Sequence, residues 1–295
     1  MAAGATNVTS LAAHRKRRNG MEPQSHDWVF PGINLHGISA GSGPLVVCTH
    51  GITANAWVYQ PLMDALSDRF RVVSIDQRGH GRSGKPREDY SAEHYADDIA
   101  ALVRKLGGPA LLIGHSLGAR NSLVAGWKHP ELVSGVVAVD FVPFIEDQVF
   151  SDLEARVGGG DKSFGSQDEI RAYLAGRYTR LPADAIGRRA QYGYVQADRA
   201  WKALADPAAM KQTCVGLRED LVPAMTGVTV PVLLVRGRDS KLVSPWAWAR
   251  AKALRPDLPA VELDADHYVV EEAHQALAAE VSGFYKTHCK KEKHA

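Results

Sequence analysis

Short apolar runs alternate with amphipathic stretches of helical length from Trp28 onward. The runs are rich in β-branched residues and nearly continuous, which is typical of strands buried on both faces. Their alternation with helices predicts an α/β fold with a mostly parallel eight-stranded sheet flanked by helices. Pro31-Gly32 predicts a tight turn, and so an antiparallel pair, at one edge. The expected strands are residues 26–30, 34–39, 45–49, 71–75, 110–114, 135–139, 231–235 and 260–264, and the expected helices are 56–68, 93–106, 117–128, 246–255 and 271–287.

This alternation stops between Pro143 and about Pro223, where the pattern is helical, arginine-rich and interrupted by three glycines at 158–160. We expect an all-helical insertion over residues 143–222, after the sixth strand. Such an insertion would form a lid over a ligand crevice, because crevices open at the carboxyl ends of parallel strands. The α/β core is then expected over residues 25–142 and 223–288. Residues 1–24 are expected to be a disordered arm, with a transit peptide as the alternative.

Composition and charge mainly exclude functions. The chain has 35 Lys+Arg against 33 Asp+Glu, and this formal net charge of +2 argues against a nucleic-acid-binding or polybasic membrane surface. No apolar run reaches the length of a membrane span. Three widely spaced cysteines suit a reducing cytoplasm and predict neither a disulfide framework nor a zinc site. No HExxH motif is present and no G-x-G-x-x-G opens a helix after the first strand, so we expect no metal and no nucleotide cofactor.

The strongest chemical signal is GHSLG, Gly114 to Gly118, between an apolar strand and a helical pattern. In this context G-x-S-x-G predicts a sharp strand-to-helix turn that exposes the hydroxyl of Ser116. Glycines two residues to either side allow neighbouring backbone to pack closely. The N–H of Leu117, at the helix N-terminus, is placed to bind an oxyanion. Ser116 is therefore the candidate nucleophile.

A second motif, His50-Gly51-Ile52, follows the third strand. A loop here can bring the N–H of Ile52 toward the same point as that of Leu117, and two donors aimed at one developing negative charge suit acyl transfer. The side chain of His50 is expected to brace the loop. The segment DQRGHGRS, residues 76–83, is expected to be a cross-bonded turn that supports its neighbour.

The candidate general base is His267, which follows the last strand and precedes the terminal helix. A histidine at the carboxyl end of a strand can accept the proton of Ser116. The segments HGITANAWVYQPL, DQRGHGRS, GHSLG and DADHYVVEE then occur in the order found in α/β-hydrolases, and the chain resembles that family over residues 28–287.

The acidic residue that would complete a catalytic triad with Ser116 and His267 does not occupy the position that is usual in the family. Most members of the family carry it after the strand that follows the lid, and in GRDSKLVS, residues 237–244, that position holds Ser240. Asp239 stands one residue early, where an extended backbone points its side chain the other way. Asp140 closes the sixth strand at the same sheet edge and can hold the other ring nitrogen of His267. We expect Asp140 to be the acid, with Asp239 as the alternative.

Details of the lid, EARVGGG, YLAGRYTRLP and GYVQADRAW, add to the resemblance. They resemble α/β-hydrolases of vitamin B6 (pyridoxine) degradation that cleave the amide of a small dicarboxylate, giving acetate, ammonia, carbon dioxide and succinic semialdehyde. The resemblance implies that Arg156, Arg177 and Tyr178 bind the substrate carboxylates and that Ile52 and Leu117 form the oxyanion hole. Eight arginines lie in the lid, and which of them face the pocket stays open.

Several alternatives remain. The same scaffold serves carbon–carbon bond hydrolases and carboxylesterases, and a ligand receptor with this fold is a further alternative. Ser116 could form an acyl-enzyme, or Ser116 and His267 could activate water directly. The sequence does not determine the oligomeric state, for which a homodimer is one alternative.

Overall fold

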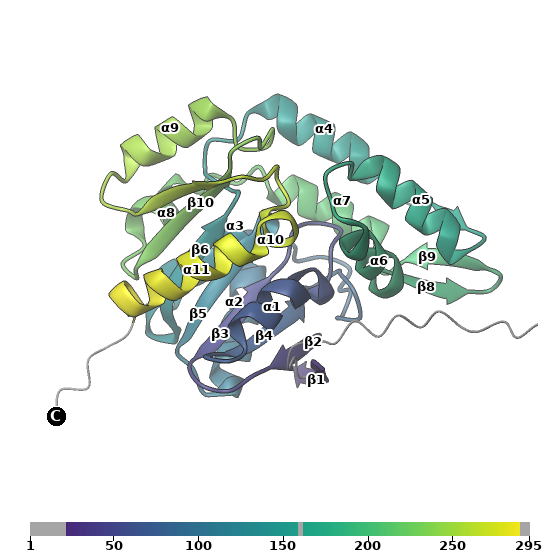
Figure 1. The fold of residues 1–295 in the computed structure, drawn as a ribbon, viewed down its shortest axis with the longest axis horizontal. Coiled ribbons are helices and arrows are strands. Elements are labelled where there is room, and N and C mark those ends of the chain that lie inside the picture. Colours follow the sequence, from purple (N-terminus) through teal and green to yellow (C-terminus); the bar gives the residue numbers. More distant parts are fainter. Residues whose placement is uncertain (1–21, 159–161, 290–295) are drawn as a thin grey trace, which may run out of the picture.

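A computed structural model describes residues 22–158 and 162–289. Its centre is an eight-stranded sheet in the order β1-β2-β4-β3-β5-β6-β10-β11 (Figure 1). The arm predicted over residues 1–24 lies outside the described residues up to position 21, and Gln24 already belongs to β1. The predicted fold class is confirmed. The strands are β1 (Gln24–Phe30), β2 (Ile33–Ala40), β3 (Leu45–Thr49), β4 (Arg71–Asp76), β5 (Ala110–His115), β6 (Val133–Val139), β10 (Val232–Gly237) and β11 (Ala260–Leu263).

The sheet is parallel from β4 to β11, and β1 and β2 form an antiparallel edge. Phe30 pairs with Ile33, so Pro31-Gly32 is a two-residue turn, as predicted. Gly32 has φ +83°, a conformation that glycine adopts without a Cβ clash. All parallel strands therefore present their carboxyl ends at one edge of the sheet.

Both faces of the sheet are covered by helices because successive strand residues point to opposite sides. Leu111 and Ile113 pack into one apolar cluster with α1 (Gln60–Leu66), α10 (Val269–Glu272) and α11 (His274–Phe284). Leu112, between them, packs into the other cluster with α2 (Ala92–Leu106), α3 (Leu117–Lys128), α8 (Val222–Gly227) and α9 (Pro245–Leu254). Short 3-10 turns at Ala56–Tyr59 and Pro130–Leu132 and a π-turn at Tyr285–Cys289 complete the core.

The insertion after β6 lies at the carboxyl edge of the sheet, on the upper right in Figure 1. It contains α4 (Asp147–Gly158), β7 (Ser163–Phe164), α5 (Gln167–Arg177), α6 (Ala183–Tyr192), β8 (Tyr194–Ala197), β9 (Ala200–Ala203) and α7 (Pro207–Gly216).

The expectation of an all-helical insertion was wrong, because β7, β9 and β8 form a small antiparallel sheet. The pair Ala197 and Ala200 closes a hairpin over Asp198-Arg199, and Asp198 has φ +51°. Strands of two to four residues are too short to display a period of two, so the surrounding helical pattern concealed them. In the described part of the chain, no helix combines the length and apolar character needed to cross a bilayer.

Candidate active site

The candidate nucleophile lies between β5, which ends at His115, and α3, which begins at Leu117. Ser116 has φ +55° and ψ −118°, a strained conformation outside the favoured regions for a residue with a side chain. The flanking glycines make this turn feasible. A Cβ on Gly114 would meet the carbonyl oxygen of Gly118 at 2.2 Å, and one on Gly118 would meet that of Thr49 at 2.0 Å. The motif therefore forms the sharp turn that its sequence predicts.

His267, in the loop after β11, is held by a buried carboxylate. Its Nδ1 donates to Oδ2 of Asp140 at 2.7 Å, and the side chain of Asp140 is fully buried. Asp140 directly follows β6 and has φ +52°, so it lies at the same sheet edge as Ser116. This contact fixes the tautomer in which Nε2 of His267 is free to accept a proton.

The other candidate acid lies elsewhere. Asp239 is half exposed and pairs with Arg180 at 2.6 Å. Ser240, in the position that most relatives use for the acid, donates its hydroxyl hydrogen to Oδ2 of Asp140 at 2.5 Å. The N–H of Gly237 donates to Oδ1 at 2.8 Å. The structure thus brings Asp140, and not Asp239, to His267.

Ser116 and His267 line one cavity, which we call the serine cavity. Ile52 lines it as well, and Ile52 packs against the apolar cluster to which Leu117 belongs. As the first residue of α3, Leu117 has an N–H for which the helix offers no acceptor. The two predicted oxyanion donors therefore lie in the segments that flank Ser116.

His115 has a role in the site that was not predicted from the sequence. Its Nε2 donates to the carbonyl oxygen of His267 at 2.7 Å, and the two rings lie 4.6 Å apart. Burial, followed by the nearby His267, lowers the pKa of His115 well below 6.5, so this donor ring is neutral. The alternation of β5 could have indicated the contact, because His115 shares its side of the strand with Leu111 and Ile113, toward α10.

The loop around His50 and the turn after β4 support each other. His50 is fully buried, donates from Nδ1 to the carbonyl oxygen of Gly51 and accepts at Nε2 from the N–H of Gln77. Asp76 accepts from the N–H groups of Ala56 and Arg82. These contacts give His50 and the turn the bracing geometry expected of them.

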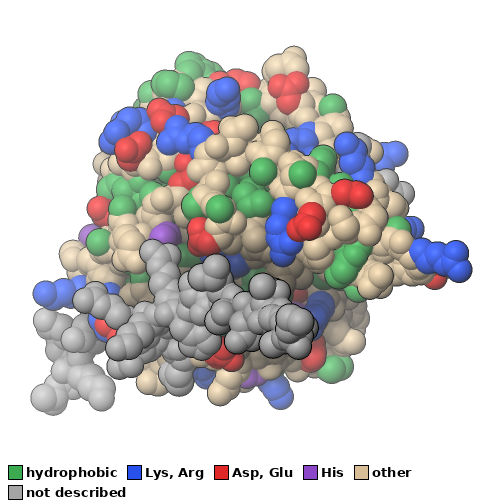
Figure 2. Space-filling model, turned by 45° about the vertical axis from the view of Figure 1, so that its right-hand side comes forward, with side chains coloured by type: hydrophobic (Ala, Val, Ile, Leu, Met, Phe, Trp, Pro, Cys, Tyr) green, Lys and Arg blue, Asp and Glu red, His purple; other side chains and the backbone are tan. Residues whose placement is uncertain are grey.

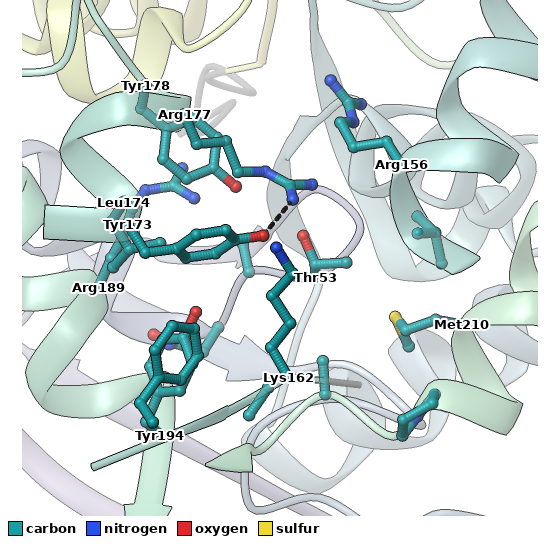
Figure 3. Close-up of a pocket in the computed structure, with 18 residues that line it drawn as sticks. Thr53, Arg156, Lys162, Tyr173, Leu174, Arg177, Tyr178, Arg189, Tyr194 and Met210 are labelled. Atoms are coloured by element: carbon teal, nitrogen blue, oxygen red, sulfur yellow. Dashed lines mark hydrogen bonds between the residues drawn. The ribbon is translucent and has the colours of Figure 1, made fainter. Parts of the chain in front are cut away.

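Arg156, Arg177 and Tyr178 line both the serine cavity and an adjoining hollow beneath the lid, which we call the lid cavity (Figure 3). Arg177 donates from Nη1 to the hydroxyl oxygen of Tyr173 at 2.8 Å. Within the described residues, the linings of both cavities include no Asp or Glu, and no carboxylate lies within ion-pair distance of Arg156 or Arg177. The cavities therefore carry uncompensated positive charge.

A third lid arginine, Arg189, also lines both cavities and was not singled out from the sequence. It forms a buried ion pair with Glu271, and its guanidinium lies 4.6 Å and 5.1 Å from the ring centroids of Tyr178 and Tyr268. Burial alone lowers the pKa of Arg189, but the Glu271 carboxylate outweighs this and raises it above the ordinary value. The helical spacing could have found it, because Arg189 follows the buried Ile186 by three positions.

The remaining lid arginines are placed away from the cavities. Arg171, Arg180, Arg188 and Arg218 form ion pairs with carboxylates, and Arg199 is exposed. On the face shown in Figure 2, basic and acidic side chains are interspersed. The described residues contain no group of three or more His, Cys, Asp or Glu placed to hold a metal ion.

Comparisons with known proteins agree with this fold. The profile of the alpha/beta hydrolase family matches residues 46–280. The chain is 53% identical, over 85% of its length and 91% of the relative, to 2-(acetamidomethylene)succinate hydrolase of Mesorhizobium japonicum. A crystal structure of E-2-(acetamidomethylene)succinate hydrolase superposes with a TM-score of 0.88 at 50% identity, covering 90% of this chain and all of that one. The enol-lactonase of Burkholderia xenovorans LB400, at 22% identity and a TM-score of 0.73 over 88% of this chain and all of its own, shares the fold.

Proposed function

The chain belongs to the alpha/beta hydrolase family, and from this premise we propose that it hydrolyses the amide of (E)-2-(acetamidomethylene)succinate in vitamin B6 degradation. The products are acetate, ammonia, carbon dioxide and succinic semialdehyde. The relative at 53% identity carries the name of this activity, and the identity extends over most of both chains. The aligned region includes the lid, and in this fold the loops and insertions determine which substrate binds.

The main support for the proposal is the positive charge of the serine cavity, which lies beside Ser116. Arg156 and Arg177 line it together with Tyr178, and no described carboxylate neutralises the two arginines. Arg156 is exposed and Arg177 is partly buried, so both guanidinium groups are accessible to an anionic ligand. A planar guanidinium matches a carboxylate with two parallel hydrogen bonds. A small dicarboxylate therefore suits this cavity better than a neutral ester.

Acylation begins when Nε2 of His267 takes the hydroxyl proton of Ser116, whose Oγ attacks the acetamide carbonyl carbon. The oxyanion accepts hydrogen bonds from the N–H groups of Ile52 and Leu117. Each such donor contributes roughly 3–4 kcal/mol, by analogy with removal of one donor in another serine hydrolase. The carbon–nitrogen bond then breaks, and the nitrogen takes the proton from His267 as the enamine leaves.

Deacylation repeats these steps with water. His267 takes a proton from water, the hydroxide attacks the acetyl ester, and acetate leaves as the proton returns to Oγ of Ser116. Asp140 stabilises the imidazolium of His267 in both halves. The released enamine takes up water, loses ammonia and becomes an aldehyde with a carboxylate on the neighbouring carbon, which loses carbon dioxide to give succinic semialdehyde.

A turnover panel tests this function. The wild type and Ser116→Ala are assayed for acetate and succinic semialdehyde release from (E)-2-(acetamidomethylene)succinate, for bleaching of a coloured dienoate, and for cleavage of a simple carboxylic ester. We expect turnover of the dicarboxylate amide by the wild type alone. Preferred turnover of the dienoate or the ester would replace the proposal, and tight binding without turnover would favour a ligand receptor.

The proposal needs only a small dicarboxylate as ligand, with no cofactor, nucleic acid or membrane as partner. The cytoplasm remains our proposed location, since Cys48, Cys214 and Cys289 are all buried as free thiols. A homodimer remains a prediction for the oligomeric state.

A further inference from the structure

The lid cavity contains a group of polar side chains to which no role has been given above. Lys162, Tyr173 and Thr53 line it, and Figure 3 shows the amine of Lys162 and the hydroxyls of Thr53 and Tyr173 facing one another. Nζ of Lys162 lies 4.8 Å from the centroid of the Tyr173 ring. Two neighbouring elements of the lid and a loop of the core that is distant in the sequence therefore bring donor groups to one point of the cavity.

The hydrogen bonding of this group leaves donors available. The hydroxyl oxygen of Tyr173 accepts from Nη1 of Arg177, so its own hydrogen can be donated elsewhere. Among the described residues, no carboxylate lies within ion-pair distance of Lys162. An ammonium and a phenol hydrogen that face the same space are complementary to an anion.

The backbone at Thr53 supplies an independent observation. Thr53 has φ +63°, a left-handed conformation that is a clear outlier for a β-branched residue. Strain of this kind costs on the order of 1–3 kcal/mol and is concentrated at functional sites. Thr53 directly follows Ile52 and lines both cavities. The strained loop thus places Ile52 in the serine cavity and Thr53 at the junction of the serine cavity and the lid cavity.

We propose that Lys162, Tyr173 and Thr53, together with Arg177, form a second anion subsite that takes the substrate carboxylate farther from the scissile amide. This inference rests on the proposed function. Lys162 and Tyr173 line the lid cavity but not the serine cavity, so they meet the part of a ligand that extends away from Ser116. In the proposed substrate, the carboxylate on the methylene arm lies one bond farther from the amide than the other. Arg156 and Tyr178, which line both cavities, then bind the nearer carboxylate.

Steady-state kinetics with two substrates test the subsite. The dicarboxylate amide is compared with (E)-3-acetamido-2-methylacrylate, in which a methyl group replaces the methylene carboxylate arm. We expect Lys162→Met to lower kcat/KM for the dicarboxylate about 10- to 100-fold, the size of one lost charged hydrogen bond, and to change that for the monocarboxylate less than about threefold. Lys162→Arg should restore part of the loss. Lys202→Met, at an exposed lysine of β9, is the matched control and should behave as the wild type.

Binding without turnover separates failure of the subsite from failure of the proposed function. Itaconate has the carbon skeleton of the substrate's diacid, and methacrylate lacks the second carboxylate. Calorimetry should show that Lys162→Met weakens itaconate binding about 10-fold or more and leaves methacrylate binding unchanged. Equal losses on both ligands, or none on either, overturn the subsite even if the wild type is active. If the wild type releases no acetate yet Lys162→Met selectively loses itaconate, the reaction is wrong and the subsite stands.

Discussion

Ser240 donates its hydroxyl hydrogen to Oδ2 of Asp140 at 2.5 Å, and the same oxygen faces Nδ1 of His267 at 2.7 Å. Ser240, in the position where most relatives carry the acid, thus holds the carboxylate that we propose as the acid of this chain. The N–H of Gly237 completes the arrangement by donating to Oδ1. A buried carboxylate needs such donors, because charge in a dry site is costly without hydrogen-bond partners.

The first prediction separates the two candidate acids. Asp140→Asn should lower kcat about 10,000-fold, by analogy with the same change in another serine hydrolase, because an amide favours the wrong tautomer of His267. Asp239→Asn should stay within about threefold of the wild type, since it removes only an exposed ion pair with Arg180. Steady-state rates on the dicarboxylate amide measure both. A loss confined to Asp239→Asn would contradict the assignment.

The second prediction concerns Ser240 itself. Ser240→Ala removes one donor to Asp140 and leaves part of a buried carboxylate unsatisfied, so the free energy of unfolding should fall by about 1–3 kcal/mol. The rate should fall far less than in Asp140→Asn, because His267 keeps its partner. Urea unfolding and kcat on the same preparation measure the two effects. A rate as low as that of Asp140→Asn would mean that the hydroxyl, and not the carboxylate, controls His267.

Much of this arrangement is readable from the sequence. Apolar strands that end at His115 and Val139 must bring the residues that follow them, Ser116 and Asp140, to one sheet edge, because parallel strands share that edge. The one-residue displacement of Asp239 from Ser240 was likewise enough to disfavour it, since neighbouring residues of an extended chain point apart. Local periodicity thus locates groups that lie on regular elements.

What the sequence did not reveal depends on contacts between elements. Arg189 lies among eight lid arginines, and its role follows only from Glu271, which is 82 positions away along the chain. Lys162 and Thr53 meet through the packing of the lid on the core, which no local pattern encodes. The small sheet of the lid was missed for a related reason, since strands this short are determined by their partners more than by their own propensity.

The third prediction assigns a positioning role to His115. His115→Phe keeps a ring but loses the hydrogen bond to the carbonyl oxygen of His267, so the imidazole should shift and kcat should fall roughly 10- to 100-fold. KM should change less than about threefold, because no hydrogen bond joins His115 to the described lid arginines that line the serine cavity. His115→Gln, which retains a donor, should recover part of kcat. Equal changes in kcat and KM, or no recovery in His115→Gln, would indicate a purely structural role.

The fourth prediction concerns the buried pair that joins the lid to the core. Arg189→Met leaves the fully buried Glu271 carboxylate without its cation and should lower the free energy of unfolding by about 3–5 kcal/mol. The double variant Arg189→Met with Glu271→Leu should be more stable than Arg189→Met alone, because no uncompensated charge remains. Urea unfolding of the wild type, the two single variants Arg189→Met and Glu271→Leu, and the double variant measures the coupling. Additive losses would show that the pair acts through packing on Tyr178 and Tyr268.

The last prediction is a loss of stability in weak acid, which follows from three buried histidines, His50, His80 and His115. Burial is the largest cause in each case and lowers all three pKa values below 6.5, with that of His80 at about 4. In the unfolded chain these groups take up protons as the pH falls through about 6.5, whereas the folded chain holds them neutral. The unfolded state then binds more protons at these three sites, so their contribution to the free energy of unfolding decreases as the pH falls below 6.5. At pH 5.5 the expected loss is about 1.4 kcal/mol for each histidine that stays neutral, roughly 4 kcal/mol in total relative to pH 8.

Urea unfolding at the two pH values measures this loss, and His80→Asn should reduce it by about one third. His94→Gln is the matched control, because the side chain of His94 is 44% exposed and its replacement should leave the pH dependence unchanged. A free energy of unfolding that is constant between pH 8 and pH 5.5 would mean that the folded protein admits protons to these rings, and the neutral form assigned to His115 would then be wrong.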